Sequence, residues 1–329
     1  MTRMIKIAAL ALLLNSLFGA TTFAQAPPPL PTGNNGIAAK YPKDAGIGSD
    51  AAVLYADDFE SYSSTSPNWQ ASGHWNNSYG NLSIVTGASA FAGNQSVQML
   101  VPANSSQSAE GLAKSITPNQ DTLFVRFYEK FMSGYSASGS IHNGVSVTSH
   151  YPGPGNPANG TNFFFTDAEN SCDLSSTTQP CYTNSYNYYV GQRGNYGDHW
   201  YPDGTVLPDS SLQYNWGPYF ISRPQFVPNE NQWYCYELMV QANTPGLSDG
   251  RVAIWVNGNL IGDWQNIVFR TTNALQIDLA SLQFYLGSNT NSVNEIIWFD
   301  NVVMATSYIG PMSTTSNIAP PTNLTAVVK

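Results

Sequence analysis

The feature that most limits what this chain can fold into is the two-residue alternation of apolar and polar side chains along short runs. Residues 123–131, 234–242 and 251–257 all follow this alternation. It is typical of a β-strand with one buried face, and no stretch of the body shows a convincing amphipathic helix pattern. Asn257-Gly258 then gives a strong signal for a hairpin turn. The runs predict one all-β body, a sandwich or jelly roll of two stacked antiparallel sheets.

Both ends of the chain differ in composition from this body. Arg3 and Lys6 precede an apolar run and then small residues, which is the pattern of a secretory signal peptide. The apolar run is too short to span a bilayer, so we expect a secreted, monomeric protein with no membrane partner. The expected divisions are a signal peptide at 1–26, a Pro/Gly-rich linker or loosely attached strap at 27–50, the jelly-roll domain at 51–310, and a flexible Ser/Thr/Pro-rich tail at 311–329.

Charge and cysteine content narrow the partners and the compartment. The formal net charge of −9 argues against nucleic acid, because phosphate binding needs an electropositive face. A local group of Arg and Lys would still allow an acidic polysaccharide as the partner. Cys172 and Cys181 are close in sequence, and a disulfide between them is plausible in an exported chain. Cys235 lies in a strand-like run and is expected to be a small buried residue.

Several predicted strands carry polar and aromatic side chains on the face opposite their apolar one. The strands at 123–131, 234–242 and 251–257 present such a face, and the run 141–150 adds histidines. If these strands lie side by side in one curved sheet, their polar faces line a single groove. Aromatic side chains would there stack on sugar rings, while Arg and Lys would pair with carboxylates. The alternative is a set of unrelated solvated faces.

Three stretches of the sequence resemble the concanavalin A-like polysaccharide lyases, in particular the alginate and glucuronan lyase-like branches. Residues 233–258 carry a Trp, a Glu on the following strand, an Asn-x-Pro-Gly turn, an Asp-Gly and a second Trp strand that ends in a turn. Residues 298–311 are similar to the closing strand of that group, and 123–130 to its strand of alternating Arg and aromatic residues. The resemblance implies a concanavalin A-like jelly roll, cleavage of a uronic-acid polysaccharide by β-elimination, and no organic cofactor.

A lyase of this kind must neutralise the uronate carboxylate, remove the α-proton and protonate the leaving oxygen. The sequence offers His142 or His150 as the base and a tyrosine such as Tyr188 or Tyr128 as the acid. Arg126 is the expected partner of the carboxylate, so we take His142, Tyr188 and Arg126 as the catalytic set. The expected substrate-binding residues are Tyr128, Lys130, His150, Gln192, Glu237, Gln241, Arg251 and Trp255.

Two other activities compete with the lyase hypothesis. A hydrolase of the laminarinase type needs Glu-x-Asp-x-x-Glu on one strand, and Glu237 has no acidic partner two residues away. That reaction is therefore not expected. The remaining alternative is a non-catalytic, lectin-like extracellular protein that keeps the groove and binds glycan without cutting it.

One structural metal site is also expected from the sequence. Asp57 and Glu60, at the start of the body, and Asp300, at its end, resemble the paired terminal strands that share a calcium ion in many jelly rolls. Calcium prefers carboxylate and carbonyl oxygens and would join the two ends of the domain. The alternative is that these carboxylates are ordinary turn and capping residues.

Overall fold

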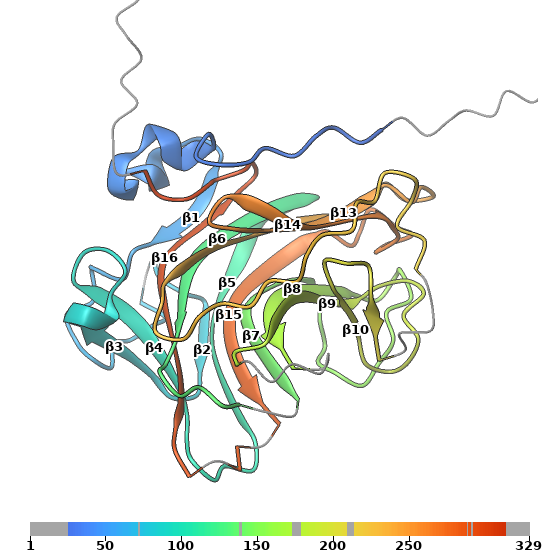
Figure 1. Cartoon of the computed structure of the whole chain (residues 1–329). Helices are drawn as coiled ribbons and strands as arrows, with labels where there is room; N and C mark the ends of the chain where they lie inside the picture. The colour runs from blue at the N-terminus through green and yellow to red at the C-terminus, as the bar shows by residue number, and fades with distance from the viewer. Residues whose placement is uncertain are drawn as a thin grey trace, which may run out of the picture.

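The computed structural model describes residues 26–313 except 72, 138–139, 173–178, 209–213, 288 and 291. The expected signal peptide and most of the expected tail therefore lie outside the described residues. The described chain is a sandwich of two antiparallel sheets with a few short 3₁₀ turns (Figure 1). The predicted all-β jelly-roll architecture is confirmed.

The first sheet, sheet A, is built from eight of the strands. Along the sheet their order is β14 (Asn259–Ile267), β13 (Gly250–Val256), β12 (Tyr234–Gln241), β6 (Thr122–Phe131), β16 (Glu295–Ala305), β4 (Gln95–Val101) and β3 (Leu82–Thr86), and β1 (Val53–Asp57) pairs with β16. The strands that carry the Arg126, Glu237 and Arg251 faces are thus direct neighbours, as the groove hypothesis required.

The second sheet, sheet B, packs against sheet A through the core. Its order is β11 (Val206–Leu207), β10 (Asp198–Trp200), β9 (Tyr182–Tyr188), β8 (Phe164–Ser171), β7 (Ile141–Ser149), β15 (Ile277–Leu286), β5 (Ser108–Gln120) and β2 (Asn77–Tyr79). Chain order and sheet order differ, since β15 returns from late in the chain to lie between β7 and β5. Residues far apart in sequence therefore share one face of sheet B.

The apolar side of the predicted alternation forms the core between the sheets. Val125 on β6 lies opposite Leu238 on β12, which lies opposite Ile254 on β13, and all three are fully buried. Leu282 and Phe284 on β15 are equally buried. A side chain of this size contributes roughly 1.5–3 kcal/mol when it leaves water, so the matched register of apolar positions fixes how the strands pair.

Residues 26–50, which we call the strap, lie against the outer face of sheet A instead of forming a linker. The strap contains three short 3₁₀ turns, η1 (Ile37–Lys40), η2 (Pro42–Asp44) and η3 (Ile47–Ser49), and Figure 1 draws it in blue. Ile37 and Ile47 are buried in an apolar cluster with Trp255. The Trp255 indole N–H also donates a hydrogen bond to the Pro31 carbonyl. The expected loose attachment at 27–50 is therefore not what the structure contains.

A buried carboxylate fastens the end of the chain beside the strap and makes stability depend on pH. Both oxygens of Glu237 accept backbone N–H groups, from Ile309 at 2.7 Å and Gly310 at 2.8 Å. Burial raises the pKa of Glu237 from 4.5 to about 7, although these hydrogen bonds act in the opposite direction. The folded protein therefore holds a proton that the unfolded chain has released once the pH exceeds the unfolded pKa.

We expect the free energy of unfolding to fall as the pH rises through this window. The contribution of Glu237 is fully present below about pH 4.5 and is lost by on the order of 1–3 kcal/mol as the pH passes about 7. Urea denaturation of the wild type and of Glu237→Gln across this range measures the effect. Asp300, whose pKa burial raises to about 8, acts in the same direction in both proteins. Equal pH slopes for the two proteins would contradict the assignment to Glu237.

Candidate active site

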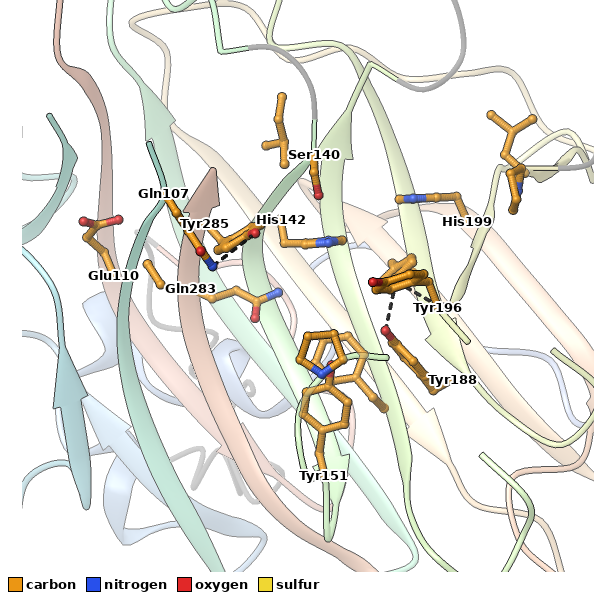
Figure 2. A pocket seen from close by; sticks show the side chains of 18 of the residues that line it. Gln107, Glu110, Ser140, His142, Tyr151, Tyr188, Tyr196, His199, Gln283 and Tyr285 are labelled. Atoms are coloured by element: carbon orange, nitrogen blue, oxygen red, sulfur yellow. Dashed lines mark hydrogen bonds between the residues drawn. The ribbon is translucent and has the colours of Figure 1, made fainter. Parts of the chain in front are cut away.

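A cavity of about 850 Å³ opens on the face of sheet B that points away from the core (Figure 2). Residues from all eight strands of sheet B contribute to it, so the site spans the whole sheet. Its lining comprises Tyr79, Gln107, Ala109, Glu110, Ser140, Ile141, His142, Tyr151, Pro154, Phe165, Tyr186, Tyr188, Tyr196, Gly197, His199, Leu207, Pro208, Gln283 and Tyr285.

The centre of the cavity wall is a carboxylate held between two imidazoles. Glu169 on β8 is buried, and its Oε2 lies 2.8 Å from Nδ1 of His142 on β7. Its Oε1 lies 2.9 Å from Nδ1 of His199 on β10, which is also 3.1 Å from Oδ1 of Asn184. Since acceptor oxygens face both Nδ1 atoms, each Nδ1 carries a hydrogen and each Nε2 is left on the far edge of the ring.

Strand register explains why these groups meet. His142 lies opposite Tyr285 across β7 and β15, Glu169 lies opposite Asn184 across β8 and β9, and His199 lies opposite Tyr186 across β10 and β9. Directly paired residues in an antiparallel sheet point to the same face. Four neighbouring strands and β15 therefore project their polar side chains into one cavity, with 23% of the His142 side chain and 14% of the His199 side chain exposed.

The pKa values of two buried carboxyl groups in this wall move in opposite directions. Burial opposes ionisation of Glu169, but the charges and hydrogen bonds of His142 and His199 outweigh it and lower its pKa to about 2. Burial, and then the negative charge of Glu169, raise the pKa of Asp167 well above its usual value. Glu169 is thus the anion that orients the histidines, while its charge and burial disfavour ionisation of Asp167 beside it. Strongly shifted carboxyl pairs of this kind are typical of functional sites.

Tyrosines complete a chain of hydroxyl groups next to the histidines. The ring of Tyr186 lies 4.6 Å from the rings of both His142 and His199. Its hydroxyl accepts the N–H of Gly197 at 2.9 Å and donates to the hydroxyl of Tyr188 at 3.2 Å. Tyr188 lines the cavity wall but is fully buried there, and the Tyr186 O–H, itself bonded by Gly197, would stabilise negative charge on the Tyr188 oxygen.

An amide side chain from β15 bonds the buried carboxyl group of Asp167. Gln283 Nε2 donates to Oδ2 of Asp167 at 3.0 Å, and Oδ1 of Asp167 accepts the backbone N–H of Tyr186 at 2.9 Å. His142, Asp167 and Glu169 also each place one ligand-type atom within 4.8 Å of the others, which is the spacing of a metal-binding group. Protein donors already bond both oxygens of Asp167, and His142 Nδ1 bonds Oε2 of Glu169, in this arrangement.

The predicted catalytic and binding residues separate into four places: the cavity, a depression beside it, the loop after β9 and the outer face of sheet A. His142 and Tyr188 line the cavity together. His150 lies in a neighbouring depression of about 440 Å³, with its Nε2 3.4 Å from Asp278. Gln192 organises the loop after β9, because its amide group bonds Ala158, Gly194 and Tyr196 backbone atoms.

The other predicted groove residues lie on the wrong sheet for this cavity. Their strands are neighbours, and their polar faces point outward as expected, but that face belongs to sheet A and is covered by the strap. They are Arg126, Tyr128, Lys130, Glu237, Gln241, Arg251 and Trp255. Arg126 is fully buried in an ion pair with Asp44, and Arg251 forms a bidentate pair with Asp263 at 2.8 and 2.9 Å. The expectation of one groove shared with His142 was therefore wrong.

The remaining members of this group also have partners inside the protein. The Tyr128 hydroxyl accepts the Met312 N–H, Lys130 donates to the Ala88 carbonyl, and Gln241 donates to the Asp249 carbonyl. The first contact holds the C-terminal segment against sheet A, and the other two hold loops against it, so all three are structural.

The carboxylates expected to share calcium are occupied by hydrogen-bond donors instead. Asp57 accepts the hydroxyls of Tyr55 and Tyr62 and the indole N–H of Trp75. Glu60 accepts the backbone N–H groups of residues 94 and 95, and Asp300 accepts those of residues 91, 92 and 301. Calcium needs oxygen lone pairs that point at the ion. This donor set does not fit a calcium site, and the three residues are better explained as structural acceptors.

The residues that sequence reasoning missed are the ones that join the histidines. Glu169, Asp167, Tyr186 and His199 were not among the predicted site residues. The signal was present as i, i+2 pairs on one strand face, Asp167 with Glu169 and Tyr186 with Tyr188. Without the knowledge that β8 and β9 are neighbours, neither pair pointed to a histidine.

The cysteines follow the expectation. A disulfide joins Cys172 and Cys181 across the loop between β8 and β9. Cys235 is free and buried, and burial raises its pKa to about 12, so it is an inert thiol. Among the described residues, no helix is long and apolar enough to cross a membrane.

The two-sheet jelly roll of this chain is also the fold of several solved polysaccharide lyases. The family model described as polysaccharide lyase 14 matches residues 205–297, which include β12 to β15. The expected resemblance to the jelly-roll polysaccharide lyases is thus confirmed. The match includes Gln283 and Tyr285 but none of His142, Glu169 or Tyr188, so those roles rest on geometry alone.

Solved structures agree on the fold. Alginate lyase Aly36B superimposes with a TM-score of 0.56 and 17% identity over 78% of this chain and 98% of that one. A variant of the same lyase in complex with an alginate trisaccharide superimposes with a TM-score of 0.57 and 16% identity, over 78% of this chain and 99% of that one. The PL-14 alginate lyase from Aplysia kurodai superimposes with a TM-score of 0.51 and 14% identity, over 78% of this chain and 100% of that one. No curated protein sequence matches this chain significantly.

Proposed function

We propose that this protein is an exported polysaccharide lyase that cleaves a uronic-acid polysaccharide by β-elimination, without an organic cofactor and as a monomer. The observation that carries the proposal is the pair of imidazoles oriented by buried Glu169 beside the Tyr186–Tyr188 hydroxyl chain, in an open cavity of a lyase-type jelly roll. The polysaccharide lyase 14 segment and the alginate lyases of the same fold support the reaction class.

The proposed reaction uses His142 as the base, as the sequence suggested. Nε2 of His142 takes the proton from C5 of the uronate, the electron pair forms the C4–C5 double bond, and the bond from C4 to the glycosidic oxygen breaks. Tyr188 gives its hydroxyl proton to that oxygen. Protonated His199 faces the carboxylate of the same sugar, the role first expected of Arg126, which is buried on sheet A.

The test is an ultraviolet assay for unsaturated uronate on alginate, glucuronan, pectate and glycosaminoglycans. Wild-type protein is expected to produce a rising absorbance on at least one polymer. His142→Ala is expected to lower kcat about 10²–10⁴-fold, the usual contribution of a positioned base. Tyr188→Phe is expected to have a comparable effect, whereas His150→Ala, outside the cavity, should leave kcat within about twofold of the wild type.

The competing function is glycan binding without cleavage. No rise in absorbance on any polymer, together with retardation of the protein in a gel that contains one of them, would establish glycan binding and reject the lyase function. Full activity in His142→Ala would instead reject the assignment of the base.

A further inference from the structure

The Lys and Arg side chains of the described residues do not line the cavity. There are nine of them: Lys40, Lys43, Lys114, Arg126, Lys130, Arg193, Arg223, Arg251 and Arg270. Lys114 lies on β5 of sheet B, but its ammonium group donates to the His74 carbonyl, and Arg193, in the loop that also carries Tyr196, pairs with Asp198. The short internal stretches outside the described residues contain neither Lys nor Arg in the sequence. The positive charge that a substrate meets must therefore come from His142 and His199.

The charge of this cluster leaves no surplus for a second carboxylate. In the proposed reaction His142 is the unprotonated base and His199 is protonated, so the single positive charge of His199 is already paired with Glu169. One substrate carboxylate is held by the N–H of His199, and the cluster carries no further positive charge. A second free carboxylate bound near the first would lose its hydration without gaining a counter-charge, which is costly.

The two sides of the cavity also lack a counter-charge for the sugars next to the reacting one. In Figure 2, Gln107 and Glu110 lie on one side of His142, and Tyr188 and His199 lie on the other. Glu110 is buried, and its carboxyl group accepts hydrogen bonds from Ser108 and Asn81, so this side of the cavity supplies no positive charge for a second carboxylate.

Aromatic rings supply much of the remaining wall. Tyr79 is 40% exposed and Tyr196 is 65% exposed, and both line the cavity with Tyr151 and Tyr285. Tyrosine offers a flat apolar face and one hydroxyl group, which suits the faces of uncharged sugar rings.

We propose, on the basis of the lyase function above, that the site takes a glycan in which one free uronate is flanked by uncharged sugars, and disfavours a continuous polyuronate. The flanking sugars are either neutral hexoses or uronates whose carboxyls are esterified, since both present the same uncharged ring. The His142–Glu169–His199 cluster receives the one free carboxylate, and the tyrosines receive its neighbours.

The test compares one polyuronate before and after graded random esterification, with a heteropolysaccharide that carries one glucuronate per repeat as a separate arm. Binding is measured by gel retardation and cleavage by the ultraviolet assay. Partial esterification is expected to tighten binding about tenfold and to raise kcat/KM per free uronate. Activity on the heteropolysaccharide alone would identify neutral hexoses as the flanking sugars. Tightest binding and fastest cleavage of the unesterified parent would overturn the proposal, while leaving the lyase function intact.

A charge placed at the rim gives an independent test. Gln107 is exposed. Within the described residues, its side chain makes one hydrogen bond, from Nε2 to the Tyr285 hydroxyl at 3.4 Å. Gln107→Lys is expected to improve kcat/KM on the unesterified polyuronate about three- to fivefold, because it adds the missing counter-charge. Gln107→Met, the matched neutral variant, should leave the preference between the two polymers unchanged. An equal response in both variants would count against the proposal.

Discussion

Glu169→Gln is expected to lower kcat about 10²–10⁴-fold while KM changes little, because the carboxylate orients the histidines and does not touch the substrate. A glutamine keeps the size of the side chain but offers one acceptor and one donor where the carboxylate offers two acceptors. One of the two imidazoles must then turn its Nδ1 into an acceptor. Its hydrogen moves to Nε2, the atom that faces the cavity, and that ring can no longer remove a proton.

A matched variant separates this positioning role from a structural one. Glu169→Asp keeps the charge and both acceptors, and is expected to recover part of the lost kcat. Urea denaturation shows whether each variant is folded under the assay conditions. A glutamine variant with wild-type kcat, or one that loses activity only through unfolding, would contradict the role assigned to Glu169.

Asp44→Ala is expected to lower the free energy of unfolding by about 3–5 kcal/mol, because it leaves the Arg126 guanidinium buried without its counter-charge. Asp44 belongs to the strap, so this ion pair joins the N-terminal segment to β6 of sheet A. Lys40→Ala is the control on the same segment. The Lys40–Asp50 pair is at 3.4 Å, with 67% of the Lys40 side chain exposed, and its loss should cost less than about 1 kcal/mol.

Denaturant unfolding of the two variants tests whether the strap is part of the fold. Similar losses for Asp44→Ala and Lys40→Ala would mean that the strap contributes little, and that the linker expected from its composition describes it better. The double variant Arg126→Met with Asp44→Leu should regain much of the loss, since apolar side chains of similar volume can replace a buried ion pair.

Alternation in the sequence determines the face of a strand but leaves its sheet open. The outward direction of Arg126, Tyr128 and Lys130 was predicted correctly from the period of two residues. Which sheet those residues belong to depends on strand order, and strand order depends on contacts between distant parts of the chain. His142 was therefore grouped with residues from the opposite side of the molecule.

The strap was missed for a different reason. Its Pro, Gly and Asn content is that of a linker, and only a few apolar residues, such as Ile37 and Ile47, attach it to sheet A. Those contacts are possible because β6, β12 and β13 present Phe124, Met239 and Trp255 on an outer face that the strap covers. Two isolated apolar residues within a polar segment do not predict that the segment packs against the outer face of a sheet.

The candidate site could be predicted in part. His142 and Tyr188 were chosen because elimination needs a base and an acid, and both line the cavity. Glu169 lies in a strand whose side chains are all buried, so no alternation identified its face. The chemistry of the site could thus be anticipated residue by residue, while the contact between β7, β8 and β10 that creates it could not.

The most direct test of the account is the mass of the products formed by the wild-type protein in water enriched with heavy oxygen. β-Elimination breaks the glycosidic bond without water, so the new chain end should be an unsaturated uronate that contains no heavy oxygen and absorbs in the ultraviolet. A saturated product that contains one heavy oxygen atom would mean hydrolysis, and would contradict the proposed reaction at His142 and Tyr188.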